Sequence, residues 1–462
     1  MRLIYLRWLV IGSLAIAVHA QAATRPRYGG ALRVETHAVI SSIDPLQEMS
    51  PADASVRDSI VPLVFDTLTR NDTTGKPQPY LAARWQTDPA QKRWQFWLRR
   101  GVVMQDGSAL TPAIAAQSLS SSLAGFAVRV VGESVVIESN SSVPGMLAEL
   151  SLARNAIVVR NNGTVLGSGP FRIADFQPGR RLQLNANEDY WNGQPYLDSI
   201  DIGLGQSLRD QAMHFQLGRA DVIEIAPDQV RRALQENRRV ISSSPSELIA
   251  IVVPSGTGAA ENPRMREALS LAIDRGTIQN VLLQRQGDPT GAVLPQWMSG
   301  YAFLFPAKVD VARARQMRLE AGSNQPAIQL AYDGSDTIAR TIAERVAVNA
   351  RDAGIVVQAI PSAAATTQRV PRLVRLRMES LSPQAALTAI AWQVDSAQVP
   401  RIMAAQSIEE LFEQEKELLS GFRLIPIAHV SQSYVVSPRV HDATLTREGM
   451  LPLDNVWVEA GQ

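Results

Sequence analysis

The side chains that could carry out chemistry are few and scattered. There is no cysteine, which excludes thiol catalysis and disulfides. The histidines show neither a His-Glu-x-x-His motif nor another metal-binding spacing; they are His19, His37, His214, His429 and His441. No serine lies in a Gly-x-Ser-x-Gly context, and the Gly-Ser-Gly-Pro turn at 167–170 is not a phosphate loop. We therefore expect no catalytic site, no metal and no cofactor.

Four arginines cluster in the segment RVPRLVRLR at 369–377. Alternate side chains of a strand point to the same face, so Arg375 and Arg377 would lie side by side. Their guanidinium groups could bind a ligand carboxylate. They could equally form an exposed basic edge that blocks the addition of another strand. The sequence leaves both open.

The elements that would position these residues change character near residue 245. Before it, short alternating runs predict a strand at 28–40, a half-buried strand with Trp94, Phe96 and Leu98 on one face, and a hairpin at 127–139. An apolar repeat over 55–70 predicts a helix that contains Pro62, and residues 208–236 read as helices around one short strand. This part of the chain is predicted to be rich in β-structure.

After residue 245, predicted helices alternate with strands. The segment from Asn262 is amphipathic, and a second helix over 336–354 closes on Gly354. Strand-like runs occur at 327–333 and 355–360. This alternation predicts an α/β lobe. Because the tail is β-like again, the chain is predicted to cross to a second lobe and return, with a hinged cleft between the lobes.

The first 22 residues are typical of a secretory signal. Arg2 and Arg7 flank the start of an 11-residue apolar run, and Ala20-Gln21-Ala22 offers a cleavage site. The run is too short to span a bilayer, which needs about 20 residues. Without cysteine there is no lipidation site. We therefore expect export to the periplasm as a soluble protein that is not a lipoprotein.

The composition is that of an ordinary globular protein, with 45% apolar and 19% charged residues. Without the signal segment, 43 basic residues face 44 acidic ones. This balance does not favour binding to nucleic acid or to anionic membranes. The remaining 440 residues suffice for two or three packed units.

The most informative stretch is GSGPFRIADFQPGRRLQLNANEDYWNGQPYLD at 167–198. Two alternating runs around a Pro-Gly turn predict a β-hairpin. The stretch resembles the signature of the family 5 extracellular solute-binding proteins, the peptide- and nickel-binding receptors of ABC importers. Further segments that resemble this family in order occupy residues 64–86, 94–112, 217–230 and 262–278. We expect positive φ at Gly107, Gly167 and Gly169, and core packing of Tyr190 and Trp191.

The resemblance implies a periplasmic-binding-protein-like fold of mixed α/β class, with two lobes, a hinge and an inserted subdomain. We assign residues 23–45, 165–244 and 436–462 to the sheet of lobe I. Residues 46–164 are the expected inserted subdomain, and residues 245–435 are the expected lobe II. The segment 391–419 replaces a longer stretch of the family and reads as a short helical linker, so lobe II is expected to be shortened.

The resemblance also implies where a ligand binds. Peptide-binding members carry a W-x-x-D-Y-x-D-P-like segment whose Asp pairs with the amino terminus of the ligand. The best match here is LRMESLSPQAAL at 376–387, which puts Glu379 at the Asp position. We therefore predict Glu379, Arg375 and Arg377 as ligand-binding residues.

The function implied by the resemblance is that of a substrate-binding protein of an ABC importer. It would capture an oligopeptide or a similar small solute by lobe closure and deliver it, as a monomer, to a membrane permease. A degenerate member that acts as a ligand sensor or protein scaffold is the first alternative, favoured by the shortened lobe. An exported hydrolase is the second, disfavoured by the missing catalytic constellation.

Overall fold

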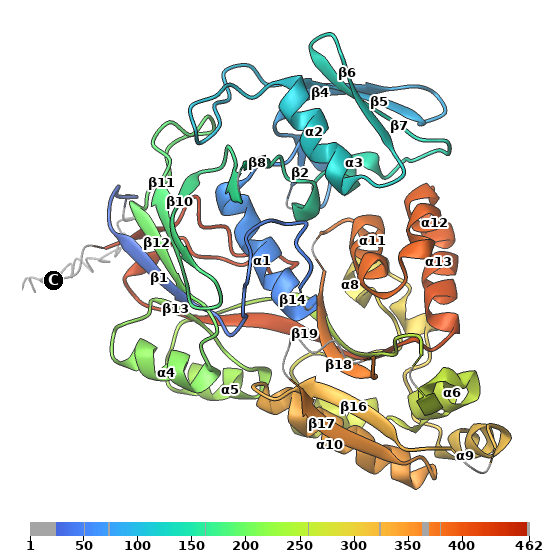
Figure 1. Cartoon of the computed structure of the whole chain (residues 1–462). Helices are drawn as coiled ribbons and strands as arrows, with labels where there is room; N and C mark the ends of the chain where they lie inside the picture. The colour runs from blue at the N-terminus through green and yellow to red at the C-terminus, as the bar shows by residue number, and fades with distance from the viewer. Residues whose placement is uncertain are drawn as a thin grey trace, which may run out of the picture.

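The computed structural model describes residues 25–49, 51–72, 74–161, 163–256, 258–322, 325–362, 369–378 and 380–459. The predicted signal peptide and Glu379 lie outside these ranges. The described chain forms two lobes joined by one large mixed sheet, with a smaller subdomain at the top of Figure 1. The mixed α/β, two-lobed architecture predicted from the sequence is confirmed. None of the described helices is long and apolar enough to cross a bilayer.

Within the described residues the large sheet has 11 strands, in the order β10-β11-β12-β1-β13-β19-β14-β18-β16-β17, with β15 beside β19. The first five strands belong to lobe I, where β1 pairs in parallel with both β12 and β13. The predicted hairpin is confirmed at the sheet edge and turns at Gly179, whose φ is +69°. The lobe I strands are β1 (Ala31–Glu35), β10 (Phe171–Gln177), β11 (Arg181–Ala186), β12 (Ser199–Gly203) and β13 (Val222–Glu224).

Three helices accompany this half of the sheet. They are α1 (Pro51–Val64), α4 (Leu208–Gln216) and α5 (Pro227–Gln235). Apolar side chains of α1 share one buried cluster with Leu32 and Ile200 of the sheet. The predicted helix over 55–70 is therefore present but starts and ends earlier, with Pro62 in its last turn.

Gly167 and Gly169 have a role that differs from the predicted one. Positive φ is confirmed at Gly107, at +86°, but it is not found at Gly167 or Gly169. A Cβ on Gly169 would lie 2.5 Å from the carbonyl carbon of Val64, and one on Gly167 would overlap the Val64 carbonyl oxygen. The turn passes so close to the end of α1 that neither position has room for a side chain.

The subdomain at the top of Figure 1 is a four-stranded antiparallel sheet covered by α2. Trp94 and Phe96 point into its core, as their alternation predicts. Thr111 caps α2 by accepting a hydrogen bond from the backbone N–H of Ile114. The elements are β4 (Ala82–Thr87), β5 (Arg93–Leu98), α2 (Pro112–Ser122), β6 (Ala127–Val131), β7 (Ser134–Glu138) and α3 (Met146–Glu149). Two short pairs accompany them: β2 (Thr69–Asn71) with β3 (Pro77–Pro79), and β8 (Val159–Asn161) with β9 (Thr164–Leu166).

Two long antiparallel strands, β14 (Val240–Val252) and β19 (Leu424–Val436), run from lobe I into lobe II. Their register shifts between Ser242 and Pro245, and again between Pro245 and Glu247. Such irregularities bend a sheet locally. The boundaries predicted at 245 and 435 fall inside these two strands, and the division into domains stays a prediction.

Lobe II combines the remaining sheet strands with helices, as its alternating pattern predicts. Its strands are β15 (Asp288–Pro289), β16 (Ile328–Asp333), β17 (Val357–Ser362) and β18 (Arg372–Arg377). Its first helices are α6 (Pro263–Ala272), α7 (Arg275–Thr277), α8 (Gln296–Ser299), α9 (Val311–Glu320) and α10 (Thr337–Asp352). Gly354 closes α10 with a φ of +76°. A small pair near the C-terminus joins β20 (Val440–His441) and β21 (Trp457–Val458).

The segment predicted to be a short helical linker is a packed helical layer instead. It contains the end of α11 (Pro383–Val394), together with α12 (Val399–Ala404) and α13 (Ile408–Ser420). Apolar side chains of all three helices are buried within this segment, namely Ala391, Val399, Ile402, Met403, Leu411 and Leu418. Their core is continuous with that of the inserted subdomain, since Phe96 and Ile402 belong to the same apolar cluster.

Candidate functional site

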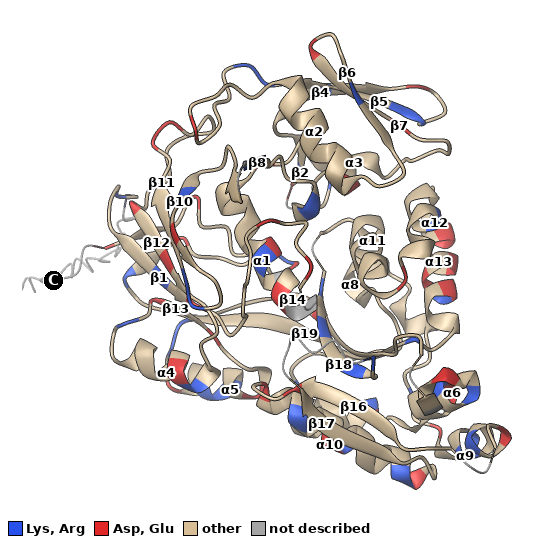
Figure 2. Cartoon of the chain, viewed as in Figure 1, with Lys and Arg blue, Asp and Glu red and all other residues tan. Residues whose placement is uncertain are grey.

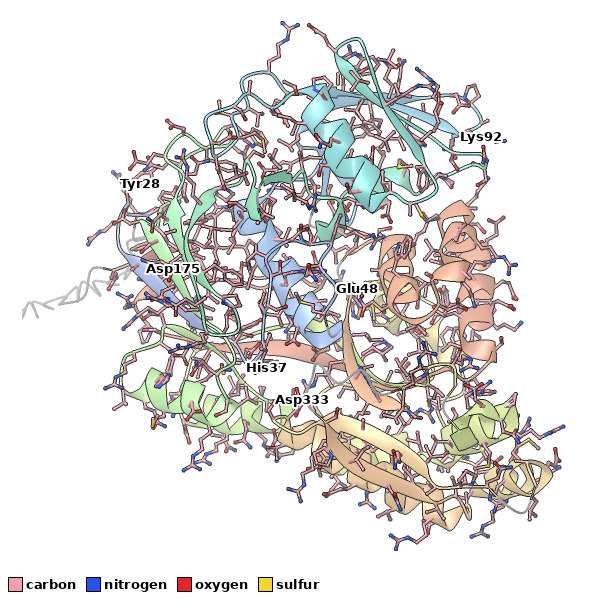
Figure 3. The ribbon with its side chains drawn as sticks, viewed as in Figure 1. Tyr28, His37, Glu48, Lys92, Asp175 and Asp333 are labelled. Carbon is pink, nitrogen blue, oxygen red and sulfur yellow. The ribbon has the colours of Figure 1, made fainter. Side chains whose placement is uncertain are left out.

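A cavity of about 180 Å³ lies between the lobes, where β14 and β19 pass from one lobe to the other. Its walls come from the loop after β1, from the N-terminal ends of α4, α5 and α10, and from β14, β18 and β19. Figure 3 labels His37 in this wall, and Asp333 at the end of β16, shortly before α10. Both lobes therefore contribute side chains to the same cavity.

His37 and Glu224 form an ion pair in the lobe I wall. The imidazole Nδ1 of His37 lies 2.7 Å from Oε2 of Glu224, and the backbone N–H of His37 donates to the same oxygen. The Glu224 charge raises the pKa of His37 to about 9. Burial would raise the pKa of Glu224, but the charge of His37 and its hydrogen bonds outweigh burial and lower that pKa to about 2. Thr36 and Gln211 donate further hydrogen bonds, so Glu224 is saturated with donors.

Arg375 binds two carboxylates in the lobe II wall. Its Nη2 lies 2.9 Å from Oδ2 of Asp336, and its Nη1 donates to Oε2 of Glu247 at 3.2 Å. The other oxygen of Asp336 caps α10 by accepting from two backbone N–H groups. Burial would lower the pKa of Arg375, but the two carboxylates outweigh burial and raise it. Arg375 thus ties the start of α10 to β14.

Arg377 has a weaker set of partners. Its Nε lies 3.6 Å from Oε1 of Glu247, beyond hydrogen-bond distance, and its guanidinium interacts with Tyr434. Only 10% of its side chain is exposed. Its Nη1 is buried and has no hydrogen-bond partner. Arg377 therefore presents an unsatisfied donor, which is costly unless something else accepts from it.

The structure decides part of what the sequence left open. Arg375 and Arg377 share a face, as predicted, and both line the cavity. The alternative of an exposed basic edge is wrong, because the side chains of Arg375 and Arg377 are only 20% and 10% exposed. Figure 2 shows the basic positions of β18 in blue within this central region. Glu379 lies outside the described residues, and a ligand role for any of the three stays a prediction.

Close to this position the lobes contact each other directly. The side-chain amide of Asn71 donates to Oγ of Ser380 at 2.8 Å. The Gln384 side chain packs so tightly on Gly145 that a Cβ there would overlap it. A small apolar cluster joins the same two surfaces and consists of Ala148, Leu152 and Ala385. The start of α11 is thus docked on the inserted subdomain.

Sequence reasoning missed the four other charged residues of the cavity. They are His37, Glu224, Glu247 and Asp336. The available signal was a single acid inside an apolar strand, Glu224 in DVIEIAP and Glu247 in SELIAIVV. Because buried charges need partners, such an acid indicates an ion pair or a site. His429, predicted to be a packed core histidine, is confirmed as one: its Nε2 lies 2.8 Å from the carbonyl oxygen of Val293.

The signature stretch forms a packing centre elsewhere. Tyr190 and Trp191 pack as predicted, and both donate to the buried carboxylate of Asp66, as does Ser168. Burial raises the pKa of Asp66 although these donors oppose the change. None of these four residues lines the cavity. Among the described residues, no group of three or more His, Asp or Glu side chains could hold a metal ion.

The model of the bacterial extracellular solute-binding proteins, family 5 (middle), matches residues 134–405. The chain belongs to this family. Its similarity to curated family 5 proteins is low: it is 23% identical over 240 residues to the nickel-binding protein NikA of Staphylococcus aureus, covering 48% of this chain and 49% of NikA. The oligopeptide-binding protein AppA of Bacillus subtilis is 26% identical over 170 residues, or 35% of this chain and 31% of AppA. The chain thus spans half or less of the length of these relatives.

Solved structures extend the similarity of the fold to almost the whole chain. AgaA from A. tumefaciens R10, in complex with agropinic acid, superposes with a TM-score of 0.82 at 17% identity, covering 94% of this chain and 99% of AgaA. AppA of B. subtilis, in complex with a nonapeptide, superposes with a TM-score of 0.79 at 15% identity, covering 94% and 100%. This family 5 chain therefore has the two-lobed fold of binding proteins, and the family consists of solute-binding proteins rather than enzymes.

Proposed function

We propose that this protein is the periplasmic substrate-binding receptor of an ABC importer, which captures a small solute between its lobes and delivers it to a membrane permease. The cavity that both lobes line carries the proposal, and membership of the family supports it. Export by the predicted signal peptide and action as a monomer are parts of the same proposal.

In the proposed mechanism the two lobes close by bending about β14 and β19, the strands that connect them. Separation of the lobes would divide the cavity, with His37 and Glu224 on one side and Arg375, Arg377 and Glu247 on the other. The register shifts in β14 and β19 lie where such bending would occur. A ligand held by both walls binds the closed state better than the open one, and this difference drives closure.

Relatives of this chain bind very different ligands. By name, they bind nickel, an oligopeptide and agropinic acid. Family membership therefore leaves the ligand open, and we keep Arg375, Arg377 and Glu379 as the proposed ligand-binding residues.

Native mass spectrometry of protein purified without denaturation, followed by thermal shift against amino acids, peptides and nickel–histidine complexes, tests the transport proposal. We expect a co-purified small molecule or a raised melting temperature with at least one solute. No bound mass and uniformly unchanged melting would contradict it. If a peptide binds, Glu379→Gln should weaken it by tenfold or more, because a lost charge-assisted hydrogen bond costs about 1.5–3 kcal/mol; unchanged affinity would remove Glu379 from the site.

One observation favours a second candidate, a sensor or scaffold that works without ligand-driven closure. The start of α11 already contacts the inserted subdomain through Ser380 and Gln384. Small-angle scattering distinguishes the two functions. A receptor should become more compact when its ligand is added, whereas a permanently closed scaffold should keep one radius of gyration.

A further inference from the structure

We propose that the cavity between the lobes binds a small solute of amino-acid size through one carboxylate, and that Arg377 is the residue that binds this carboxylate. This inference rests on the proposed function, because it names the ligand class of that receptor. It also reduces the set of proposed ligand-binding residues, because it gives Arg375 a structural role and leaves Arg377 as the cavity arginine that binds the ligand.

The unsatisfied donor is the first argument. Nη1 of Arg377 is buried without a partner, whereas Arg375 is engaged by Asp336 and Glu247. A guanidinium group offers paired N–H donors whose geometry matches a carboxylate. Because Arg377 lines the cavity, a ligand carboxylate bound against its guanidinium would satisfy Nη1 without breaking any ion pair of the wall.

The N-termini of three helices give the second argument. The N-cap residues of α4, α5 and α10, which are Ser207, Ala226 and Asp336, all line the cavity. Ser207 and Asp336 cap α4 and α10 through their side chains, but the N-cap of α5 is Ala226, which provides no side-chain hydrogen bond. The N-terminus of a helix carries a partial positive charge and free N–H groups that favour anions. The uncapped α5 therefore turns its N-terminus to the cavity, beside Asp228, the acidic residue of its first turn.

The charged side chains of the wall leave a donor free rather than an acceptor. The carboxylates of Glu224, Glu247 and Asp336 face three bases, His37, Arg375 and Arg377. Among the described residues, no oxygen of these three acids is a buried atom without a partner, whereas Nη1 of Arg377 is one. An anionic group therefore finds a free donor in the wall.

The size of the cavity limits the ligand. Pockets that enclose drug-sized ligands measure roughly 300–1,000 Å³, and this cavity measures about 180 Å³. Nearby, the contacts of Asn71 with Ser380 and of Gly145 with Gln384 occupy space between the lobes. These features favour a single amino acid or a small hydroxy acid over an extended peptide.

Calorimetry on the full-length protein tests the inference with matched probes. L-alanine and L-lactate carry the carboxylate, L-alaninamide and L-lactamide replace it by an amide, and penta-alanine is an extended peptide. We expect binding of at least one carboxylate probe, at least tenfold weaker binding of its amide, and none of penta-alanine. Equal binding of acid and amide would overturn the inference, and this comparison needs no variant.

Variants then assign the role to Arg377. Arg377→Gln should weaken the carboxylate probe at least tenfold and leave the amide unchanged. Arg340→Gln, on the exposed face of α10, is the matched control and should change neither. If Arg377→Gln binds as tightly as wild type, Arg377 is not the ligand residue. If penta-alanine or a nickel–histidine complex binds instead, this inference is overturned while the receptor function stands. If none of these probes and none of the solutes of the thermal-shift screen binds, both are overturned.

Discussion

Arg375 and Arg377 lie two residues apart on β18, but their guanidinium groups meet different surroundings. Arg375 is fixed between Asp336 and Glu247, while one nitrogen of Arg377 has no partner. The sequence predicts that both side chains share a face, because alternation in a strand requires it. It does not predict the difference between them, because the acids that decide it come from segments more than 35 residues away along the chain.

His37 provides a prediction at the same scale. Its pKa is raised from 6.5 to about 9 by Glu224, although Arg375 and Arg377 oppose the change. A raised pKa means that the pair stabilises the fold fully below pH 6.5 and loses this contribution as the pH rises through 9. We expect the difference in unfolding free energy between wild type and His37→Gln to shrink from pH 6.5 to pH 9.5, as measured by urea denaturation.

The Glu224→Gln background is the control for this prediction. Without the carboxylate, His37→Gln should cause no pH-dependent difference over that range. A difference that stays constant with pH in the wild-type background would show that the proton on His37 does not matter for stability. The side chain of His37 is 30% exposed, so solvent screening reduces the size of the effect.

At the scale of elements, hydrophobic periodicity predicts most of what is found. The buried positions of α6 include Met265, Leu269 and Ala272, as the amphipathic pattern requires. The pattern fails for α11, where the residues between Ala385 and Ala391 are buried on every side, so no periodicity shows which face of the helix packs against a neighbour. Only the neighbouring subdomain and α12 define its environment, and the linker predicted over 391–419 begins inside this packed helix.

The packed character of α11 predicts a large difference between two alanines. Ala391 is fully buried, whereas Ala397, six residues later, is exposed. Ala391→Glu would bury an unpaired carboxylate, and we expect a loss of about 3 kcal/mol or more in unfolding free energy. Ala397→Glu should stay within about 0.5 kcal/mol of wild type. If chemical denaturation gives the two variants similar stability, this segment behaves as an unpacked linker.

At the scale of the whole molecule, the question is what holds the two lobes together. The large sheet is continuous through β14 and β19, and one apolar cluster joins the inserted subdomain to lobe II. The hydrogen bond from Asn71 to Ser380 and the packing of Gln384 on Gly145 close the far side. No periodicity in the sequence reveals these contacts, because they join surfaces that meet only after both lobes have folded.

Gly145 offers a way to separate the lobes without touching the cavity. Its φ of −78° suits any residue, so a side chain there causes no backbone strain. Its Cβ, however, would overlap the side chain of Gln384, whose Nε2 is held by the carbonyl groups of Ile402, Met403 and Ala405. We expect Gly145→Gln to force the inserted subdomain away from α11 and to increase the radius of gyration in small-angle scattering.

Because a carboxylate ligand would be held by both walls, the Gly145→Gln variant should also bind it more weakly. Gly421→Gln, at a site with negative φ and open space around it, should leave both the radius and the affinity unchanged. An unchanged radius for Gly145→Gln with full stability would mean that this contact does not hold the lobes closed in solution.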